Sequence, residues 1–309
     1  MHRVGSLGER AGSLAAKQDC SILAYSHVAT SAFAAAGGGK KVLIQMQPHR
    51  AAVRTALQSD KFLPQFRDQI RNELSWSQKV FATFLREPQL ADLCIVASSY
   101  THKTMVENGV SSERVSVIPY GVDLEFFCPA DAQSNKFSVL FVGQLCRQKG
   151  LHYLLETWRR LKLQRAELRI VGHLPSNTSA ISGYQSDASF LGPLDWIALR
   201  EEYRRADLLC LPSLSEGFGQ VILEAMACGT PVPATTSCGA SDLIPHGESG
   251  LMMSTADLDS LISSLEWGSK KDKLQSMRPA AGATAEQYPW AKFRKNIVDQ
   301  LRSLTIHGT

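Results

Sequence analysis

Short apolar runs alternate along the chain with segments whose apolar residues recur at helical spacing. The runs have the length of buried strands, and glycine, proline or polar residues end them. Because predicted helices separate the runs, the pattern favours an α/β protein with parallel sheets. The predicted strands are 21–26, 41–46, 92–99, 115–119, 137–143, 168–172, 189–192, 207–212 and 250–253. The predicted helices are 29–36, 63–87, 101–109, 144–158, 199–205, 220–229 and 289–304, while residues 1–20 form a tail or a first helix.

Residues 215–232 are the stretch around which we expect the rest of the chain to be organised. They follow the apolar run 207–212 and continue into a helix that Gly229 closes and Pro231 stops. The order is therefore strand, glycine-containing turn and helix N-terminus. Such a turn is where doubly wound sheets bind anions, because free N–H groups and the positive end of the helix dipole point outward together.

Two carboxylates and two glycines give this turn its chemistry. Glu216 would repel a phosphate at contact distance, so we expect it to accept hydrogen bonds from sugar hydroxyls. Glu224 lies one turn into the helix, where its carboxylate could reach a ribose diol. Gly217 and Gly219 would let the backbone come close to a ligand. Taken singly, Glu216 and Glu224 are also consistent with an acidic first turn and an ordinary helix-face glutamate. The N–H groups expected to take the phosphates belong to Phe218, Gly219 and Gln220.

The complete string is far more specific than its parts. Glu216 and Glu224 enclose seven residues that begin Gly217-Phe218-Gly219, and the string ends with 225–232, Ala-Met-Ala-Cys-Gly-Thr-Pro-Val. This pattern resembles the signature of family-4 glycosyltransferases, the group with the "glycosyl transferases group 1" domain, and the resemblance extends over about residues 90–255. It implies the GT-B fold, in which two Rossmann-like parallel-sheet domains face a cleft. It also implies retaining transfer of a sugar from a nucleoside diphosphate.

The resemblance also indicates cations for the donor's diphosphate. Lys149 matches the family lysine that holds this group, and fixed positive charge is worth most there because the leaving diphosphate gains charge as the glycosidic bond breaks. The family's companion arginine directly follows the glycine at the position of Gly143, but this chain has Gln144 there. We expect Arg147 to substitute for it from the next turn. Both cations are also consistent with solvated residues at a helix start.

Other site residues follow from the same resemblance. Backbone groups near Gly192 and Leu194 would read the nucleotide base. The turn after the run 41–46 often carries a histidine that faces the acceptor or the transferred sugar, and His49 is our candidate, with a surface histidine beside a proline turn as the alternative. Gly121 lies in the turn near the hinge, and we expect it to need a positive φ.

The N-terminal part holds about four predicted strands before the hinge, whereas the family's first domain normally begins with further strands and a glycine-rich turn. The glycines at 37–39 precede their strand, which is the reverse of a phosphate-binding fingerprint. We therefore predict an abbreviated acceptor-side domain over 1–128 and a nucleotide-sugar-binding domain over 129–288. A terminal helix over 289–309 is expected to cross back to the first domain.

Composition and charge exclude several classes of protein. The 309 residues, 44% hydrophobic and 20% charged, are typical of a globular protein with room for two domains. The net charge of +4 permits contact with anionic lipid or substrate, but no clustered basic face indicates nucleic-acid binding. No apolar run approaches the ~20 residues that span a bilayer. We therefore expect a cytoplasmic protein, with peripheral membrane contact as the alternative.

Cysteines and acidic residues give no indication of a metal. The seven cysteines are odd in number, lack paired metal spacing and fit small apolar residues in a reducing compartment. Asp257-Leu258-Asp259 opens a predicted helix, where positions two apart face different sides and acids suit the dipole. The resemblance to GT-B enzymes likewise implies no metal, so the expected small molecule is the nucleotide-sugar donor itself, with no separate cofactor.

The leading hypothesis is a retaining glycosyltransferase that moves a sugar from a nucleoside-diphosphate donor to a glycan, lipid-linked or small-molecule acceptor. Glu216, Lys149, Arg147 and His49 would act at the reacting groups. The short first domain and Gln144 motivate a second hypothesis, a non-catalytic nucleotide-sugar binder. A third is a sugar-nucleotide epimerase on the same scaffold.

Overall fold

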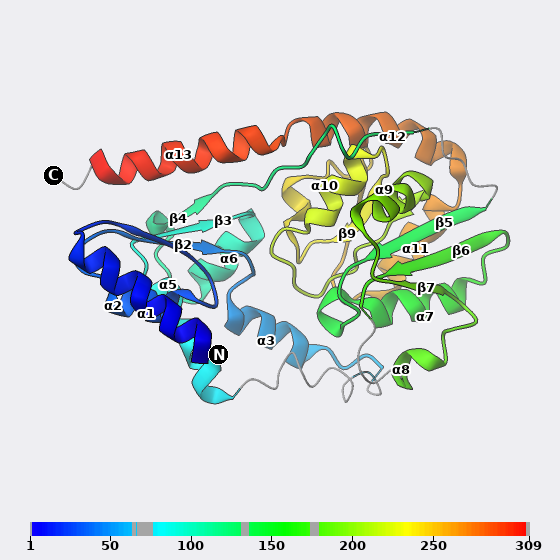
Figure 1. Ribbon diagram of the computed structural model, residues 1–309. Coiled ribbons are helices and arrows are strands. Elements are labelled where there is room, and N and C mark those ends of the chain that lie inside the picture. The colour runs from blue at the N-terminus through cyan, green and yellow to red at the C-terminus, as the bar shows by residue number, and fades with distance from the viewer. Residues whose placement is uncertain (1, 64–65, 67–76, 131–135, 174–178, 307–309) are drawn as a thin grey trace.

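The structure, a computed structural model, describes residues 2–63, 66, 77–130, 136–173 and 179–306. These residues form two lobes, each with a parallel sheet (Figure 1). The N-terminal sheet has the order β1-β2-β3-β4, and the C-terminal sheet has the order β7-β6-β5-β8. The α/β architecture with parallel sheets predicted from the apolar runs is confirmed.

The N-terminal lobe contains strands β1 (Ile22–Tyr25), β2 (Lys41–Gln45), β3 (Leu93–Val96) and β4 (Val115–Val117). Its helices are α1 (His2–Lys17), α2 (Ala29–Ala35), α3 (Arg50–Ser59), α5 (Gln78–Leu90), α6 (Ser99–Glu107) and the short η3 (Ser112–Arg114). The first part of the helix that we expected over 63–87 lies outside the described residues.

The C-terminal lobe contains strands β5 (Phe137–Val142), β6 (Ala166–Val171), β7 (Ser189–Gly192), β8 (Leu208–Leu209), β9 (Val232–Thr235) and β10 (Gly250–Met253). Its helices are η4 (Arg147–Lys149), α7 (Leu151–Leu161), α8 (Ser179–Ser182), α9 (Trp196–Arg205), α10 (Gln220–Ala227), η5 (Gly239–Asp242), α11 (Leu258–Gly268), α12 (Lys271–Glu286) and α13 (Trp290–Ile306). β9 and β10 pair with each other and continue the sheet beyond β8, since Leu211 N–H donates to the Pro233 carbonyl at 2.9 Å. Among the described residues, no helix is long and apolar enough to span a bilayer.

Both sheets are covered on both faces, which explains why their strands read as continuous apolar runs rather than alternating ones. In the C-terminal lobe, Val139 and Phe141 of β5 face a core that includes residues of α7 and α11. Leu140 and Val142 of the same strand face the opposite core, with residues of α9, α10 and α12. In the N-terminal lobe, α2, α5 and α6 contribute to one core and α13 packs on the other face.

The chain crosses between the lobes after β4 and again before α13, and the two crossing segments touch. Val122 N–H donates to the Tyr288 carbonyl at 2.8 Å, and Val122 forms a parallel bridge with Pro289. Gly121 does not have the positive φ that we expected. Glycine is required there for space, because a Cβ would lie 2.5 Å from the Trp290 Cα.

One glycine divides the helix that we predicted over 144–158. Gly150 has φ +71°, and a Cβ there would lie 1.8 Å from the Pro212 carbonyl oxygen. The left-handed backbone ends η4 after Lys149, and α7 begins at Leu151. The predicted diphosphate cations, Arg147 and Lys149, therefore belong to the separate short helix η4, which ends in close contact with the loop after β8.

Candidate functional site

The N-terminus of α10 presents a row of free backbone donors. The helix begins at Gln220, as predicted, after Gly219 in the left-handed region at φ +79°. Within the described residues, no hydrogen bond takes the N–H groups of four successive residues, Phe218, Gly219, Gln220 and Val221. Four donors without a partner among the described residues, at the positive end of a helix dipole, would suit an anion.

Glu216 and Lys149 lie together beside this helix end. The Lys149 ammonium contacts a Glu216 carboxylate oxygen, and the other oxygen accepts from Gly217 N–H at 3.1 Å. The Lys149 side chain passes Gly143, where an added Cβ would lie 3.9 Å from its Cε. The end of β5, η4 and the turn before α10 thus bring an acid, a cation and free amides to one place.

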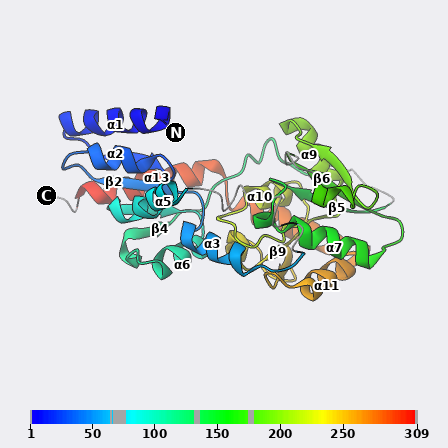
Figure 2. The ribbon, with the colours of Figure 1, turned by 90° about the horizontal axis from the view of Figure 1, so that it is seen from below.

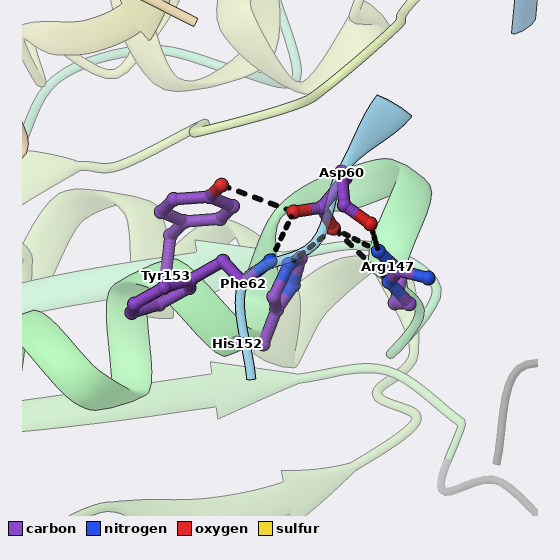
Figure 3. Close-up of polar contacts among 5 residues, drawn as sticks. All are labelled: Asp60, Phe62, Arg147, His152 and Tyr153. Carbon is purple, nitrogen blue, oxygen red and sulfur yellow. Dashed lines mark hydrogen bonds and ion pairs between the residues drawn. The ribbon is translucent and has the colours of Figure 1, made fainter. Parts of the chain in front are cut away.

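Arg147 takes a different position from the one that its spacing suggested. Its guanidinium is buried and binds Asp60, the residue at the C-terminal end of α3 (Figure 3). Nε donates to Oδ2 at 3.1 Å, and Nη2 contacts the carboxylate and donates to the Asp60 carbonyl at 2.7 Å. With these contacts made, the structure gives Arg147 a structural partner in place of the diphosphate that we expected it to hold.

Glu224 lines a pocket between α10, α9, the segment after β4 and the start of α13. The pocket has a volume of about 410 Å³, and it is lined by Val122, Asp123, Phe126, Phe127, Trp196, Gln220, Glu224 and Trp290. The Tyr203 hydroxyl donates to the Glu224 carboxylate at 2.7 Å. Burial raises the pKa of Glu224, and the hydrogen bond from Tyr203 lowers it in part. The carboxylate is therefore oriented by a buried phenol at the wall of an aromatic pocket.

The predicted base-reading segment lies next to this pocket along the chain. Gly192 ends β7 with φ +72°, and nothing lies within 4 Å of where its Cβ would be. Leu194 packs against the core beneath α9 and α10. Trp196, which lines the pocket, is the first residue of α9 and follows two residues later.

His49 is buried, in contrast to the cleft-facing side chain that we expected. It is 4% exposed and caps the N-terminus of α3, where its Nδ1 accepts from Ala51 N–H at 3.4 Å. The backbone N–H of His49 donates to the Thr104 hydroxyl at 3.0 Å, and burial lowers the pKa of the imidazole. Capping explains the placement, because a helix N-terminus needs acceptors and the inward ring supplies one.

The two lobes meet at the turn that carries Glu216. A Cβ on Gly217 would lie 2.4 Å from the Met46 carbonyl oxygen at the end of β2. The Gly217 carbonyl accepts from the Ser98 and Thr101 hydroxyls of the N-terminal lobe. Gln148 donates to Gln47 at 3.3 Å and to the Ser215 carbonyl at 2.9 Å. The proposed donor site is therefore in direct contact with the carboxyl edge of the N-terminal sheet.

Sequence reasoning missed two sets of residues at this site. One is the aromatic wall of the pocket, whose members lie up to 164 positions apart in the chain, from Phe126 to Trp290. The other is Asp60, which lies at the end of α3, a helix that the sequence pattern did not predict and that carries no recognisable motif. The only available signal was the position of Trp196, two residues after the predicted base-reading segment.

Comparisons with known proteins place this geometry in a class. The chain resembles sucrose-phosphate synthase from Thermosynechococcus elongatus, with a TM-score of 0.75 and 19% identity over 93% of this chain and 74% of that chain. It also resembles Anabaena Alr3699/HepE in complex with UDP and glucose, with a TM-score of 0.72 and 19% identity over 98% of this chain and 81% of that chain. The protein thus has the GT-B fold, which confirms the predicted fold class.

The sequence comparisons identify one domain. Residues 136–267 match the family model "Glycosyl transferases group 1", so this part of the chain is a glycosyl transferases group 1 domain, as the resemblance predicted. A D-inositol 3-phosphate glycosyltransferase from Pseudarthrobacter chlorophenolicus is 34% identical over 53% of this chain and 44% of its own length. An MMP alpha-(1->4)-mannosyltransferase from Mycolicibacterium hassiacum is 30% identical over 56% of this chain and 44% of its own. The chain spans about half the length of the curated relatives that it matches.

Proposed function

We propose that this protein is a retaining glycosyltransferase that transfers a sugar from a nucleoside-diphosphate donor to a glycan, lipid-linked or small-molecule acceptor. The observation that carries the proposal is the arrangement around α10. Free amides form its N-terminus, Lys149 and Glu216 lie on one side, and the pocket with Glu224 lies one turn further along.

The helix N-terminus suits the donor's diphosphate. Four N–H groups that have no partner in the part of the chain that the structure describes, together with the positive end of the dipole, favour an anion there. Lys149 adds a full positive charge beside these amides. This charge stabilises the transition state, because negative charge develops on the leaving phosphate as the bond to the sugar breaks. Phosphate oxygens and sugar hydroxyls would replace the contact between Lys149 and Glu216, the cation taking the phosphate and the carboxylate the hydroxyls.

The pocket beside Glu224 suits the nucleoside. Phe126, Phe127 and Trp196 supply flat apolar walls for a base, and Glu224 supplies the acceptor for a ribose diol. Glu224 is four positions after Gln220, which is roughly 6 Å along a helix axis. A ribose at Glu224 therefore leaves its 5′-phosphates close to the free amides at the start of α10.

The acceptor would approach from the N-terminal lobe, whose sheet ends at the turn that touches Gly217. In doubly wound sheets, ligands bind outside the carboxyl ends of the strands. No protein nucleophile is required if the acceptor attacks the same face that the phosphate leaves, with the leaving phosphate accepting its proton. Because one relative is named for D-inositol 3-phosphate, a phosphorylated polyol is the first acceptor to test.

Two observations favour the alternative of a nucleotide-sugar binder without transferase activity. His49 is buried, and Arg147 is engaged with Asp60, so two of the four residues that we expected at the reacting groups are occupied elsewhere. If this alternative holds, nucleoside diphosphates bind but labelled donors are neither hydrolysed nor transferred.

The test is binding followed by turnover. Calorimetry with UDP, GDP and ADP should show binding of at least one of them, and the matching labelled nucleotide sugars should be consumed with D-inositol 3-phosphate present. Replacing Glu216 by alanine should lower kcat/KM about tenfold to a hundredfold, because a hydrogen bond to a charged group contributes roughly 1.5–3 kcal/mol. The exposed Glu248→Ala is the control. The anomeric configuration of the product, read by NMR, tests retention, and an unchanged Glu216→Ala rate would remove that residue from the mechanism.

A further inference from the structure

Residues that follow β2 cross from the N-terminal lobe into the core of the C-terminal lobe. Val53 and Leu57 of α3, together with Phe66, belong to the same buried cluster as α7 and β5. Phe62 stacks on Tyr153 with ring centroids 4.5 Å apart, and Phe66 lies 5.7 Å from His152. In both views α3 runs between the lobes towards α7 (Figures 1 and 2). α3, together with Phe62 and Phe66, therefore connects the two lobes by packing into the C-terminal core.

Asp60 lies at the C-terminal end of α3 and accepts hydrogen bonds through both carboxylate oxygens. Oδ2 binds Arg147 and lies 2.9 Å from His152 Nε2, and Oδ1 accepts from Tyr153 at 3.1 Å and from Phe62 N–H at 3.0 Å (Figure 3). Only 1% of the Asp60 side chain and 5% of the Arg147 side chain are exposed. A carboxylate with this many donors is stable inside a protein only while they all stay in place.

The ionisation of the cluster follows from its contacts. Burial by itself raises the pKa of Asp60, but the hydrogen bonds from His152, Arg147 and the Phe62 N–H bring it well below its usual range. Burial is the main cause that lowers the pKa of His152, which favours a neutral ring with Nε2 as the donor to Asp60. One negative and one positive charge are therefore buried together, and neither has water as an alternative partner.

Arg147 and Lys149 are the two ends of η4, a helix of three residues. Asp60 holds the first end, while the second end presents the ammonium to the proposed diphosphate site beside Glu216. Gly150 closes η4 against the Pro212 backbone, so a shift of the Arg147 end has little room to be absorbed before it reaches Lys149.

We propose that Asp60 is a positioning residue for the donor's diphosphate, which acts by pairing Arg147 and thereby fixing η4 and the Lys149 ammonium. The inference rests on the proposed function, since it needs a diphosphate at Lys149. Without the Asp60 charge, the buried Arg147 guanidinium is unpaired, and it must leave for water. That movement displaces η4, and Lys149 no longer meets the phosphate.

The test is a double-mutant cycle read by calorimetry with UDP, GDP and ADP, at a temperature where circular dichroism shows every variant folded. Asp60→Asn should weaken nucleoside-diphosphate affinity about tenfold, which is the loss expected when one charge-assisted contact is misplaced. In a Lys149→Ala background the same substitution should change affinity less than about twofold, because the two residues act on one interaction. A general loss of structure would weaken binding in both backgrounds equally.

A second comparison separates positioning from direct contact by Arg147. The double variant Asp60→Asn/Arg147→Met has no orphaned buried charge, and apolar replacement of a buried ion pair is often tolerated. It should recover most of the lost affinity. If Arg147 itself held the phosphate, the methionine would weaken binding further. Asp299→Asn is the matched control, because it removes the acid partner of Lys295 on α13, where both side chains are more than half exposed and water replaces the contact.

The outcomes distinguish this inference from the function on which it rests. No binding of UDP, GDP or ADP by the unsubstituted protein would overturn both. Binding by the unsubstituted protein together with unchanged affinity of Asp60→Asn, or with an equal loss in both Lys149 backgrounds, would overturn the positioning role alone. If Asp60→Asn does not fold, Asp60→Glu keeps the charge but displaces the carboxylate, and the same cycle applies to it.

Discussion

Single buried acids in this protein organise segments that are distant in the chain. Asp60 binds residues 87 to 93 positions away, and Glu87 accepts from the N–H groups of His27, Ala29 and Thr30 at the start of α2. Burial raises the pKa of Glu87 although these backbone hydrogen bonds oppose the shift. Such carboxylates fix backbone positions, whereas the role proposed for Glu216 is to bind the donor.

His27 makes a testable contribution to the pH dependence of stability. Burial, with the Arg50 charge second, lowers its pKa from 6.5 to about 4. The unfolded chain therefore takes up a proton that the folded chain does not, and stability falls as pH drops from about 6.5 towards 4. Thermal unfolding followed by circular dichroism between pH 7.5 and 5 should show Tm falling with pH, and His27→Asn should flatten this slope. Asparagine tolerates the φ of +79° that His27 adopts.

The comparison between the original chain and the variant isolates His27 from other groups. His49 and His152 also have lowered pKa values and act in the same direction, whereas the raised pKa values of Glu87 and Glu224 act in the opposite one. The exposed His246 provides the control variant, His246→Asn. An equal change of slope in both variants would contradict the assignment to the buried ring.

At the scale of elements, small residues decide how closely helices approach. α1 packs on α2 through Gly8, Gly12 and Ala15, and a Cβ at Gly12 would lie 2.2 Å from the Ala32 carbonyl oxygen. The same reasoning explains Gly150 and Gly121, where the close neighbour is again backbone. Backbone contacts cannot yield as a flexible side chain can, so each of these glycines sets the position of a whole element.

Two glycines in helices should therefore respond in opposite directions to alanine. Gly12→Ala should destabilise the protein by roughly 1–3 kcal/mol, as overpacking does. Gly282→Ala, in α12, should stabilise it by roughly 0.5–1 kcal/mol, because alanine is the better helix former. Nothing lies within 4 Å of a Cβ added at Gly282. Chemical denaturation midpoints of the two variants measure the difference, and a shift of the same sign in both would refute the packing argument.

At the scale of the whole molecule, several segments of the described residues join the two lobes. The segment after β4 pairs with the segment before α13, α3 inserts into the C-terminal core, and α13 lies along the N-terminal lobe (Figure 1). Phe293, Ile297, Leu301 and Leu304 of α13 pack on a face of the N-terminal sheet. The last helix in the chain thus covers one face of the first sheet.

Shortening one side chain on the buried face of α13 should lower the stability of the N-terminal sheet. Ile297 packs against the cluster formed by Val42, Leu93, Ile95 and Ile118, so Ile297→Ala should cost roughly 1–3 kcal/mol, which is reduced from a full core value because the residue is only partly buried. Amide hydrogen exchange in β2 and β3 should become faster. The neighbouring Val298 is 44% exposed, so Val298→Ala is the matched control and should leave exchange in these strands unchanged.

The sequence by itself determined the features that depend on neighbours along the chain. Apolar runs predicted the parallel strands, and the turn with Gly217 and Gly219 predicted the start of α10 at Gln220. Those patterns are local, because strand burial and helix capping constrain consecutive residues. The motif from Glu216 to Val232 also predicted the glycosyl transferases group 1 domain that the family model matches over residues 136–267.

Only the tertiary structure decided which side chains meet. Arg147 has the spacing of a phosphate ligand, but Asp60, 87 residues away, takes its guanidinium. His49 has the place of a cleft residue, but the N-terminus of α3 turns it inward. The pocket beside Glu224 joins residues from the segment 122–127 after β4 and from α9, α10 and α13. The physical reason is the same in each case: a buried polar group takes the nearest compatible partner in space, and no local pattern encodes that partner's position.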